Sequence, residues 1–182
     1  FSSKKLWQFR EKAPDFTIAL GSCAYISEEA LDRPGKPYGS NYSIFESIAK
    51  KNPDIMIWGG DNIYLREADW DSKTGIYHRY TYSRKIKETQ ALLAKTQNFA
   101  IWDDHDFGPN DADSTYALKE VSARIFTSVF AQTPFRLAEY GDIRWSERRE
   151  NALFIALDDR THRGPVGTHV LGSDQLNWLS SE

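Results

Sequence analysis

The chain has 182 residues, of which 40% are hydrophobic, 14% aromatic and 27% charged. This length predicts a single domain over residues 1–182, and the aromatic content argues against a disordered chain. The net charge of −3 argues against a nucleic-acid-binding protein, which would carry a basic excess. No apolar run approaches the roughly 20 residues of a transmembrane helix, so no transmembrane segment is expected.

Residues 1–12 contain no apolar segment of the kind that signal peptides have, so no signal peptide is expected there. The chain has one cysteine, and an internal disulfide therefore cannot form. A single cysteine does not indicate whether the protein is in an oxidising or a reducing compartment.

The first predicted strand covers residues 16–20, where a short run of β-favouring apolar residues indicates a buried strand. Prolines and a glycine within residues 34–37 predict a loop. Ser43 and Glu46 have the spacing of a capping box, which predicts the start of a helix that ends before Pro53.

Two further strands and two further helices follow in alternation. The strands are predicted at residues 55–58 and 99–102, and a helix at 83–96 separates them. Apolar residues at helical spacing predict another helix over residues 115–132. This β-α-β-α-β-α order predicts an α/β fold with a mostly parallel sheet covered by helices.

The remaining part of the chain has a different pattern. Residues 142–145 and 152–157 are predicted as two short strands that form an antiparallel hairpin. Ser173 is expected to cap a last helix, which has run about two turns when the chain reaches Glu182. Such an ending is typical of a truncated domain.

Polar side chains follow the ends of four predicted strands, which is where the active sites of parallel α/β sheets lie. They are Cys23, then Asp61 and Tyr64, then the run Asp-Asp-His-Asp at 103–106, then Arg160. Three acids around one histidine repel one another when ionised, and a bound cation removes that penalty. The sequence therefore predicts that these groups converge at one edge of the sheet around a metal ion.

Each of these residues also has a simpler interpretation. The acidic run could be a solvated loop, with Asp61 a turn residue and Tyr64 a packing residue. Cys23 could be a small buried hydrophobe. Arg160 suits either a phosphate oxygen or an ion pair with a neighbouring Asp. The aromatic residues between positions 70 and 82 fit a packed loop better than a ligand surface.

Five motifs in chain order resemble those of the alkaline phosphatase D (PhoD-like) family, a branch of the calcineurin-like metallophosphoesterases. The resemblance runs from about residue 16 to the end of the chain. The motifs are Gly21-Ser22-Cys23-Ala24, Gly60-Asp61-x-x-Tyr64, Trp102-Asp103-Asp104-His105-Asp106, Leu157-Asp158-x-Arg160 and Leu171-Gly172-x-x-Gln175-x-x-Trp178-Leu179.

The resemblance implies an α/β/β/α sandwich of the metallophosphatase type, expected here in part. It implies metal ions, iron with calcium or another divalent metal, and hydrolysis of phosphate monoesters or diesters as substrates. It also suggests an exported protein. The metal ligands it implies in this chain are Cys23, Asp61, Tyr64 and Asp104.

The resemblance implies His105 as a catalytic residue, and Arg160 is the second catalytic candidate because a guanidinium suits phosphate oxygens. In that interpretation two cations clamp the phosphoryl group, and hydroxide formed from a bound water attacks phosphorus. His105 would stabilise the transition state or protonate the leaving alkoxide, and Arg160 would hold a non-bridging oxygen.

Two alternatives stay open. The superfamily's further histidine ligands have no counterpart before Glu182, so the chain could be a family-like fragment that binds a metal or a partner protein without catalysis. A poor phosphatase is expected of such a chain. A glycosidase using Asp104 and Asp106 as its acid pair is the other alternative, but it does not account for Cys23 or Tyr64.

Overall fold

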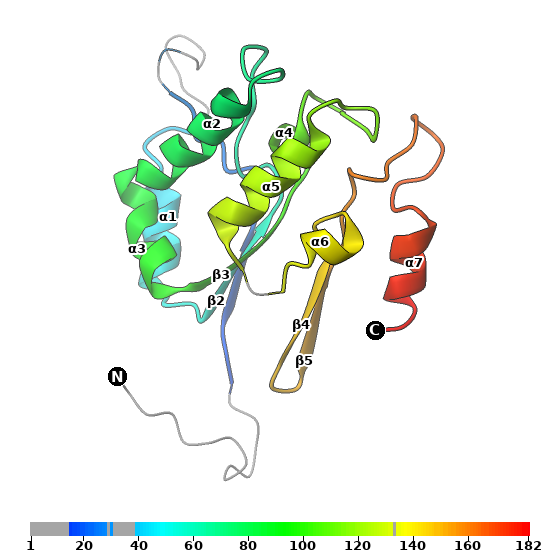
Figure 1. Ribbon diagram of the computed structural model, residues 1–182. Helices are drawn as coiled ribbons and strands as arrows, with labels where there is room; N and C mark the ends of the chain where they lie inside the picture. The colour runs from blue at the N-terminus through cyan, green and yellow to red at the C-terminus, as the bar shows by residue number, and fades with distance from the viewer. Residues whose placement is uncertain (1–14, 29, 31–38, 133) are drawn as a thin grey trace.

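The computed structural model describes residues 15–28, 30, 39–132 and 134–182 of the chain (Figure 1). The loop predicted within residues 34–37 lies outside the described residues. The strands are β1 (Ile18–Gly21), β2 (Ile55–Gly59), β3 (Gln97–Ile101), β4 (Trp145–Arg149) and β5 (Ala152–Ala156). The helices are α1 (Ser43–Lys50), α2 (Lys73–Lys85), α3 (Lys87–Lys95), α4 (Asp104–Phe107), α5 (Lys119–Phe130), α6 (Leu137–Tyr140) and α7 (Ser173–Leu179).

Strands β1, β2 and β3 form a parallel sheet in that order, as the alternating pattern predicts. The register pairs Gly21 with Trp58, and Gly59 with Ile101. All three strands therefore end at the same edge of the sheet, and the loops that follow them start side by side. This edge carries the candidate site.

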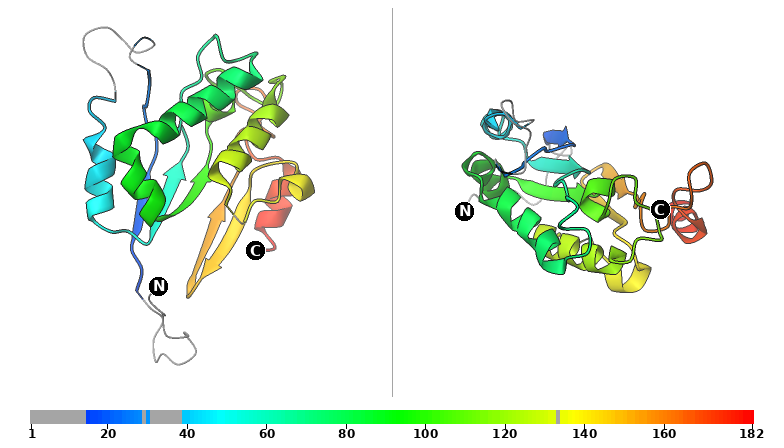
Figure 2. Two further views of the ribbon diagram at one scale, coloured as in Figure 1. Left: turned by 60° about the vertical axis from the view of Figure 1, so that its left-hand side comes forward. Right: turned by 90° about the horizontal axis from the view of Figure 1, so that it is seen from above.

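The two faces of the sheet are covered differently. Along β2, Met56 and Trp58 belong to the larger apolar core, whereas Ile55 belongs to a smaller one, because successive side chains of a strand point to opposite faces. Helices α2, α3 and α5 lie along the face of the larger core (Figures 1 and 2). Tyr80 and Phe126 are fully buried there.

The long side of β3 that faces away from β2 has no neighbouring strand among the described residues. Side chains bind its backbone groups instead. The N–H of Ala100 donates to Oε1 of Gln132 at 2.6 Å, and Nε2 of Gln132 donates back to the Ala100 carbonyl at 3.2 Å. The indole of Trp145 donates to the same carbonyl at 2.9 Å and stacks on Phe99 at 5.1 Å. Gln132 thus satisfies the backbone groups that a neighbouring strand would otherwise pair.

Strands β4 and β5 form the predicted antiparallel hairpin, with Trp145 opposite Ala156. Its first strand covers Trp145–Arg149 and shares only Trp145 with the strand predicted at 142–145. The reason is that Asp142 lies in a turn that its carboxylate closes by accepting from the N–H and Nε of Arg144. Beyond β5, buried Gln175 of α7 exchanges two hydrogen bonds of 2.7 Å with the backbone of Asp158.

Strand β1 is less buried than predicted. The side chains of Ile18 and Leu20 are 42% and 74% exposed. The reason is that β1 lies at the edge of the sheet, where the described part of the chain covers only one of its sides. Its apolar run resembles that of β2, so the residues alone did not distinguish an edge strand from a central one.

Two predicted helix caps are wrong. Neither Ser43 nor Ser173 is a cap, because each is already the first helical residue. The chain enters these helices through Tyr42 and Gly172, which have φ angles of 55° and 74° and make no capping bond with a side chain.

The predicted helix over residues 83–96 is two helices, α2 and α3, which Ile86 separates with extended backbone. The tyrosines expected in a packed loop, Tyr77, Tyr80 and Tyr82, lie on α2. Two of the four buried residues of α2 are polar, which hides its helical period from the sequence. None of the helices in the described ranges is long and apolar enough to cross a membrane.

Candidate metal centre

The turns after β1 and β2 have an unusual backbone. Cys23 and Asp61 have φ angles of 54° and 51°, and Gly60 has 98°. The turns are bonded to each other, since the N–H of Cys23 donates to the Gly60 carbonyl at 3.0 Å and that of Ala24 to the Asp61 carbonyl at 2.9 Å. Left-handed residues other than glycine cost about 1–3 kcal/mol each and cluster at functional sites.

Gly60 allows the turns after β2 and β3 to approach closely. A Cβ atom at this position would lie 2.8 Å from Cβ of Asp103. Real Cβ atoms essentially never come so close to another heavy atom, so a substitution here would push the turn of Asp61 away from that of Asp104.

The acidic run after β3 caps and begins a short helix, α4, and is not the solvated loop of the simpler interpretation. Asp103 is its N-cap and accepts from the N–H of Asp104 at 2.9 Å. Asp106 accepts from the N–H of Asp103 at 3.1 Å, which completes a capping box. Asp104 and His105 therefore stand on the first turn of a capped helix, with their backbone held in place.

The predicted site residues at the ends of the three strands lie together. One oxygen each of Asp61 and Asp104 and one ring nitrogen of His105 all lie within 4.8 Å of one another. Sγ of Cys23 is 3.7 Å from Oδ2 of Asp61. The ring of Tyr64 lies 4.6 Å from that of His105, and Tyr64 is close enough to Asp61 and Cys23 for both to raise the pKa of its phenol. Cys23 is exposed and is not the buried hydrophobe of the simpler interpretation.

The polar atoms of this cluster are suited to a cation. Oδ1 of Asp61 and Nδ1 of His105 are buried without a hydrogen-bond partner among the described residues. Burial raises the pKa of Asp61, and the carboxylates of Asp104 and Asp103 raise it further, while His105 and Tyr64 act in the opposite direction. A buried acceptor without a partner costs free energy, and a bound cation would offset that cost. A donor set of thiolate, phenolate, imidazole and carboxylates fits a transition metal, with hard oxygen ligands left for a second ion.

Arg160 lies next to this cluster and pairs with Asp103, which directly precedes Asp104. Its Nε is 2.7 Å from Oδ1 of Asp103, which a second guanidinium nitrogen also contacts. Asp159, one of the neighbours that we considered as a partner, is farther away at 3.7 Å. Burial and the Asp103 charge raise the pKa of Asp159 to about 7. A phosphate contact for Arg160 stays a prediction.

Two acids that are not among the predicted site residues accept hydrogen bonds from several parts of the chain. Asp158 is fully buried and accepts from the indole of Trp102 at 2.9 Å and from the N–H of Ile143 at 3.0 Å. Asp106 is also fully buried, and burial raises its pKa to about 7, while its hydrogen bonds with Asn62 and Asp103 act in the opposite direction. The pairing of such acids with distant donors leaves no local signal in the sequence.

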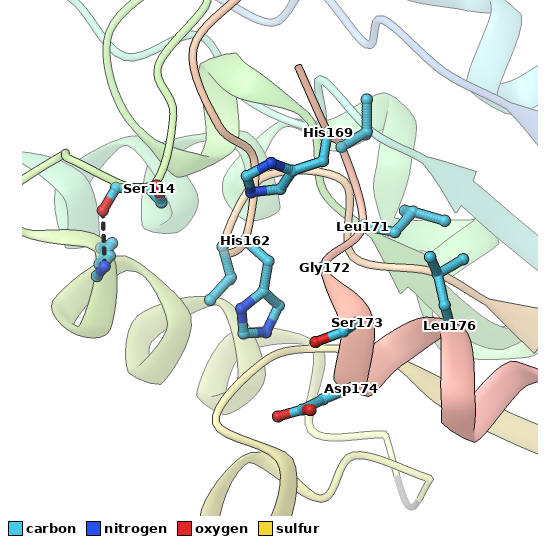
Figure 3. Close-up of a pocket in the computed structure, with 11 residues that line it drawn as sticks. Ser114, His162, His169, Leu171, Gly172, Ser173, Asp174 and Leu176 are labelled. Atoms are coloured by element: carbon cyan, nitrogen blue, oxygen red, sulfur yellow. Dashed lines mark hydrogen bonds between the residues drawn. The ribbon is translucent and has the colours of Figure 1, made fainter.

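A separate pocket lies between α5 and α7, with His162, His169, Ser173 and Asp174 in its lining (Figure 3). In the part of the chain that the structure describes, none of the predicted site residues lines it. Nε2 of His162 is 2.8 Å from Oδ2 of the buried Asp142. This hydrogen bond raises the pKa of His162, and the charge of Asp158 raises it further, against burial and Arg144.

This ion pair should make the stability of the protein depend on pH. Because the folded pKa of His162 lies above the unfolded value of about 6.5, the stabilisation is complete below that pH and is lost as pH rises through the folded pKa. Urea unfolding between about pH 6 and pH 9 should therefore show a larger loss of stability for the wild type than for His162→Gln. His169→Gln, in the same pocket, is the control and should keep the wild-type slope. Equal slopes for the wild type and His162→Gln would contradict this prediction.

Comparison with known proteins identifies the fold. The sequence matches no family model, and no curated protein matches it. The solved structure of PhoD matches with a TM-score of 0.64 and 18% sequence identity, over 91% of this chain and 38% of that chain. The chain therefore spans less than half the length of that protein. At this identity the likeness shows the fold, so the α/β fold that the motif resemblance implied is confirmed.

Proposed function

We propose that this chain carries part of the metal centre of a phosphoric ester hydrolase similar to PhoD. The observation that carries the proposal is the meeting of Asp61, Asp104 and His105 within 4.8 Å, with the Cys23 thiol 3.7 Å from Asp61. The PhoD fold supports it, because these four residues belong to three of the sequence motifs that resemble the PhoD-like family.

The ligands divide by chemistry between two ions. Cys23, Tyr64 and Asp61 would hold an iron-type ion, since thiolate and phenolate suit a Lewis-acidic transition metal. Asp61 and Asp104 would offer oxygens to a divalent ion such as calcium. Bound there, the ions would neutralise phosphate charge and lower the pKa of a water.

The remaining residues would act on the phosphate ester itself. His105, held on the first turn of α4, would stabilise the transition state or protonate the leaving alkoxide. Arg160 would hold a non-bridging oxygen while Asp103 orients its guanidinium. These groups would position and stabilise charge, which is most of what a protein contributes to phosphoryl transfer.

A cation-binding chain without catalysis is the second candidate. The observation that favours it is the 38% coverage of PhoD, because residues in the remaining part of such a protein can complete a metal site. Metal binding is common to both candidates, and turnover separates them.

Iron loading tests the proposal directly. Burial and the charge of Asp61 raise the pKa of Tyr64, so its phenol is neutral at pH 7 unless a cation binds it. The ferric-loaded protein should therefore absorb visible light, and Tyr64→Phe should remove that band. Tyr25→Phe is the control, because the Tyr25 ring lies 4.2 Å from that of Tyr64 but is not a proposed ligand. A colourless ferric-loaded wild type would remove Tyr64 from the ligands.

Hydrolysis of 4-nitrophenyl phosphate and of bis(4-nitrophenyl) phosphate by the same loaded samples tests the reaction. Metal-dependent turnover of either ester supports the hydrolase and tells a monoesterase from a diesterase. Metal binding without turnover supports the second candidate, and no metal binding contradicts both.

A further inference from the structure

Asp106 is a fully buried acid that accepts hydrogen bonds from three segments of the chain. The N–H of Asn62 lies 3.1 Å from both of its carboxylate oxygens, and Nδ2 of Asn62 lies 3.3 Å from one of them. The N–H of Asp103 donates at 3.1 Å, and the hydroxyl of Tyr80 in α2 donates at 3.0 Å. Both oxygens of this carboxylate therefore face donors.

The segments that Asp106 joins are those that carry the proposed ligands. Asn62 directly follows Asp61, and Asp103 directly precedes Asp104. Nδ2 of Asn62 also donates to the Ile101 carbonyl at the end of β3, at 2.9 Å. One carboxylate thus ties the turn after β2 to the start of α4, and a shift of either turn would break several of its bonds.

We propose that Asp106 is a positioning residue that holds Asp61 and Asp104 at the separation a bound cation requires; the proposal rests on the metal centre of the proposed function. Metal affinity depends on the geometry of the ligands, and the groups that hydrogen-bond around them are worth 10–100-fold in affinity. Asp106 is not itself a proposed ligand, because its carboxylate is occupied by backbone and tyrosine donors.

Asp106→Asn tests the proposal with little change in shape. Its amide would direct an NH₂ group at donors, so the link between the two turns should fail. Asp142→Asn is the matched control, because Asp142 is equally buried and hydrogen-bonded to Arg144 and His162, away from the proposed ligands. Both variants should be less stable in urea than the wild type, which makes global destabilisation common to the two.

Mn²⁺ affinity, measured by electron paramagnetic resonance titration, should fall by roughly 10–100-fold in Asp106→Asn. It should stay within about threefold of the wild-type value in Asp142→Asn. Equal affinities for the wild type and Asp106→Asn, or equal losses in the two variants, would overturn the positioning role.

Amide hydrogen exchange in the metal-free protein supplies a readout that does not depend on metal binding. The N–H groups of Asn62 and Asp103 should lose protection in Asp106→Asn and keep it in Asp142→Asn, while Ile57 inside β2 stays protected in both. Unchanged protection in Asp106→Asn would overturn the proposal. A wild type that binds no Mn²⁺ but shows the expected exchange pattern would refute the metal centre and with it the positioning of ligands.

Discussion

Replacing Asp61 with Asn should weaken cation binding by more than about 100-fold, since changes to residues outside the ligand shell already cost 10–100-fold. Asp61 lies beside both the thiol of Cys23, at 3.7 Å, and the possible ligand atoms of Asp104 and His105, within 4.8 Å. An amide keeps the size of the side chain but loses its charge and one acceptor. Mn²⁺ titration of the purified variant measures the effect.

Asp54→Asn is the control for this experiment. Asp54 directly precedes β2, at the opposite end of the strand from Asp61. Its exposed carboxylate accepts from the N–H of Thr17 at 2.9 Å. Its replacement should leave Mn²⁺ affinity unchanged. Wild-type affinity in Asp61→Asn would place the cation elsewhere in the chain.

Asp61→Asn should not be destabilised when no metal is present. Burial raises the pKa of Asp61, so its ionised form costs stability as pH rises through that value. Asn carries no charge and escapes this cost. Urea unfolding at pH 7 without metal should therefore show Asp61→Asn to be at least as stable as the wild type, which is the pattern of a residue kept for binding. A clear loss of stability would instead indicate a structural role.

Replacing Phe126 with Ala should destabilise the fold by about 3–5 kcal/mol, the usual cost of emptying a buried phenylalanine site. Phe126 is fully buried in α5. Its ring lies 5.4 Å from that of Trp102, 4.8 Å from Phe130 and 5.7 Å from Phe135, measured between centroids. These rings join the helical layer to the end of β3, so the cavity cannot collapse easily. Denaturant unfolding at a single pH measures the change.

Val129→Ala, in the same helix, is the control for the size of this effect. Val129 is half-buried at the margin of the same core, so its loss should cost about 1 kcal/mol. A loss below about 1 kcal/mol for Phe126→Ala would contradict the packing of α5 against the sheet. Because domains are stable by only about 5–15 kcal/mol, the expected loss would leave the variant marginal.

Much of the fold could be predicted from local patterns. The apolar runs predicted as strands at residues 55–58 and 99–102 mark β2 and β3, although β3 ends before Trp102. The apolar residues of 115–132 mark α5, which is shorter than predicted at both ends. The parallel direction of the strands follows from the alternation, because crossover connections join parallel strands. Their parallel arrangement then brings Cys23, Asp61 and the acidic run to one edge, so the location of the candidate site could be predicted from the sequence.

Features that depend on distant partners could not be predicted in the same way. The edge position of β1 is a property of the sheet and not of its residues. Gln132 pairs with the backbone of Ala100, 32 residues away, and an isolated glutamine gives no sign of this. Arg79 of α2 is buried because it pairs with Asp69 at 2.6 Å. A charged residue on the buried face hides the amphipathic pattern of this helix in the sequence.

The acidic run after β3 separates the two kinds of information most clearly. Residue types alone indicated closely spaced negative charges, because these acids are near neighbours in the chain. A cation would relieve the repulsion between their carboxylates. Only the tertiary structure assigned a different task to each acid. Asp103 faces Arg160, 57 residues later, and Asp106 faces Asn62, 44 residues earlier, while Asp104 is left beside Asp61. Chemically identical side chains differ here through the partners that folding brings to them, and those partners come from strands and loops far along the chain.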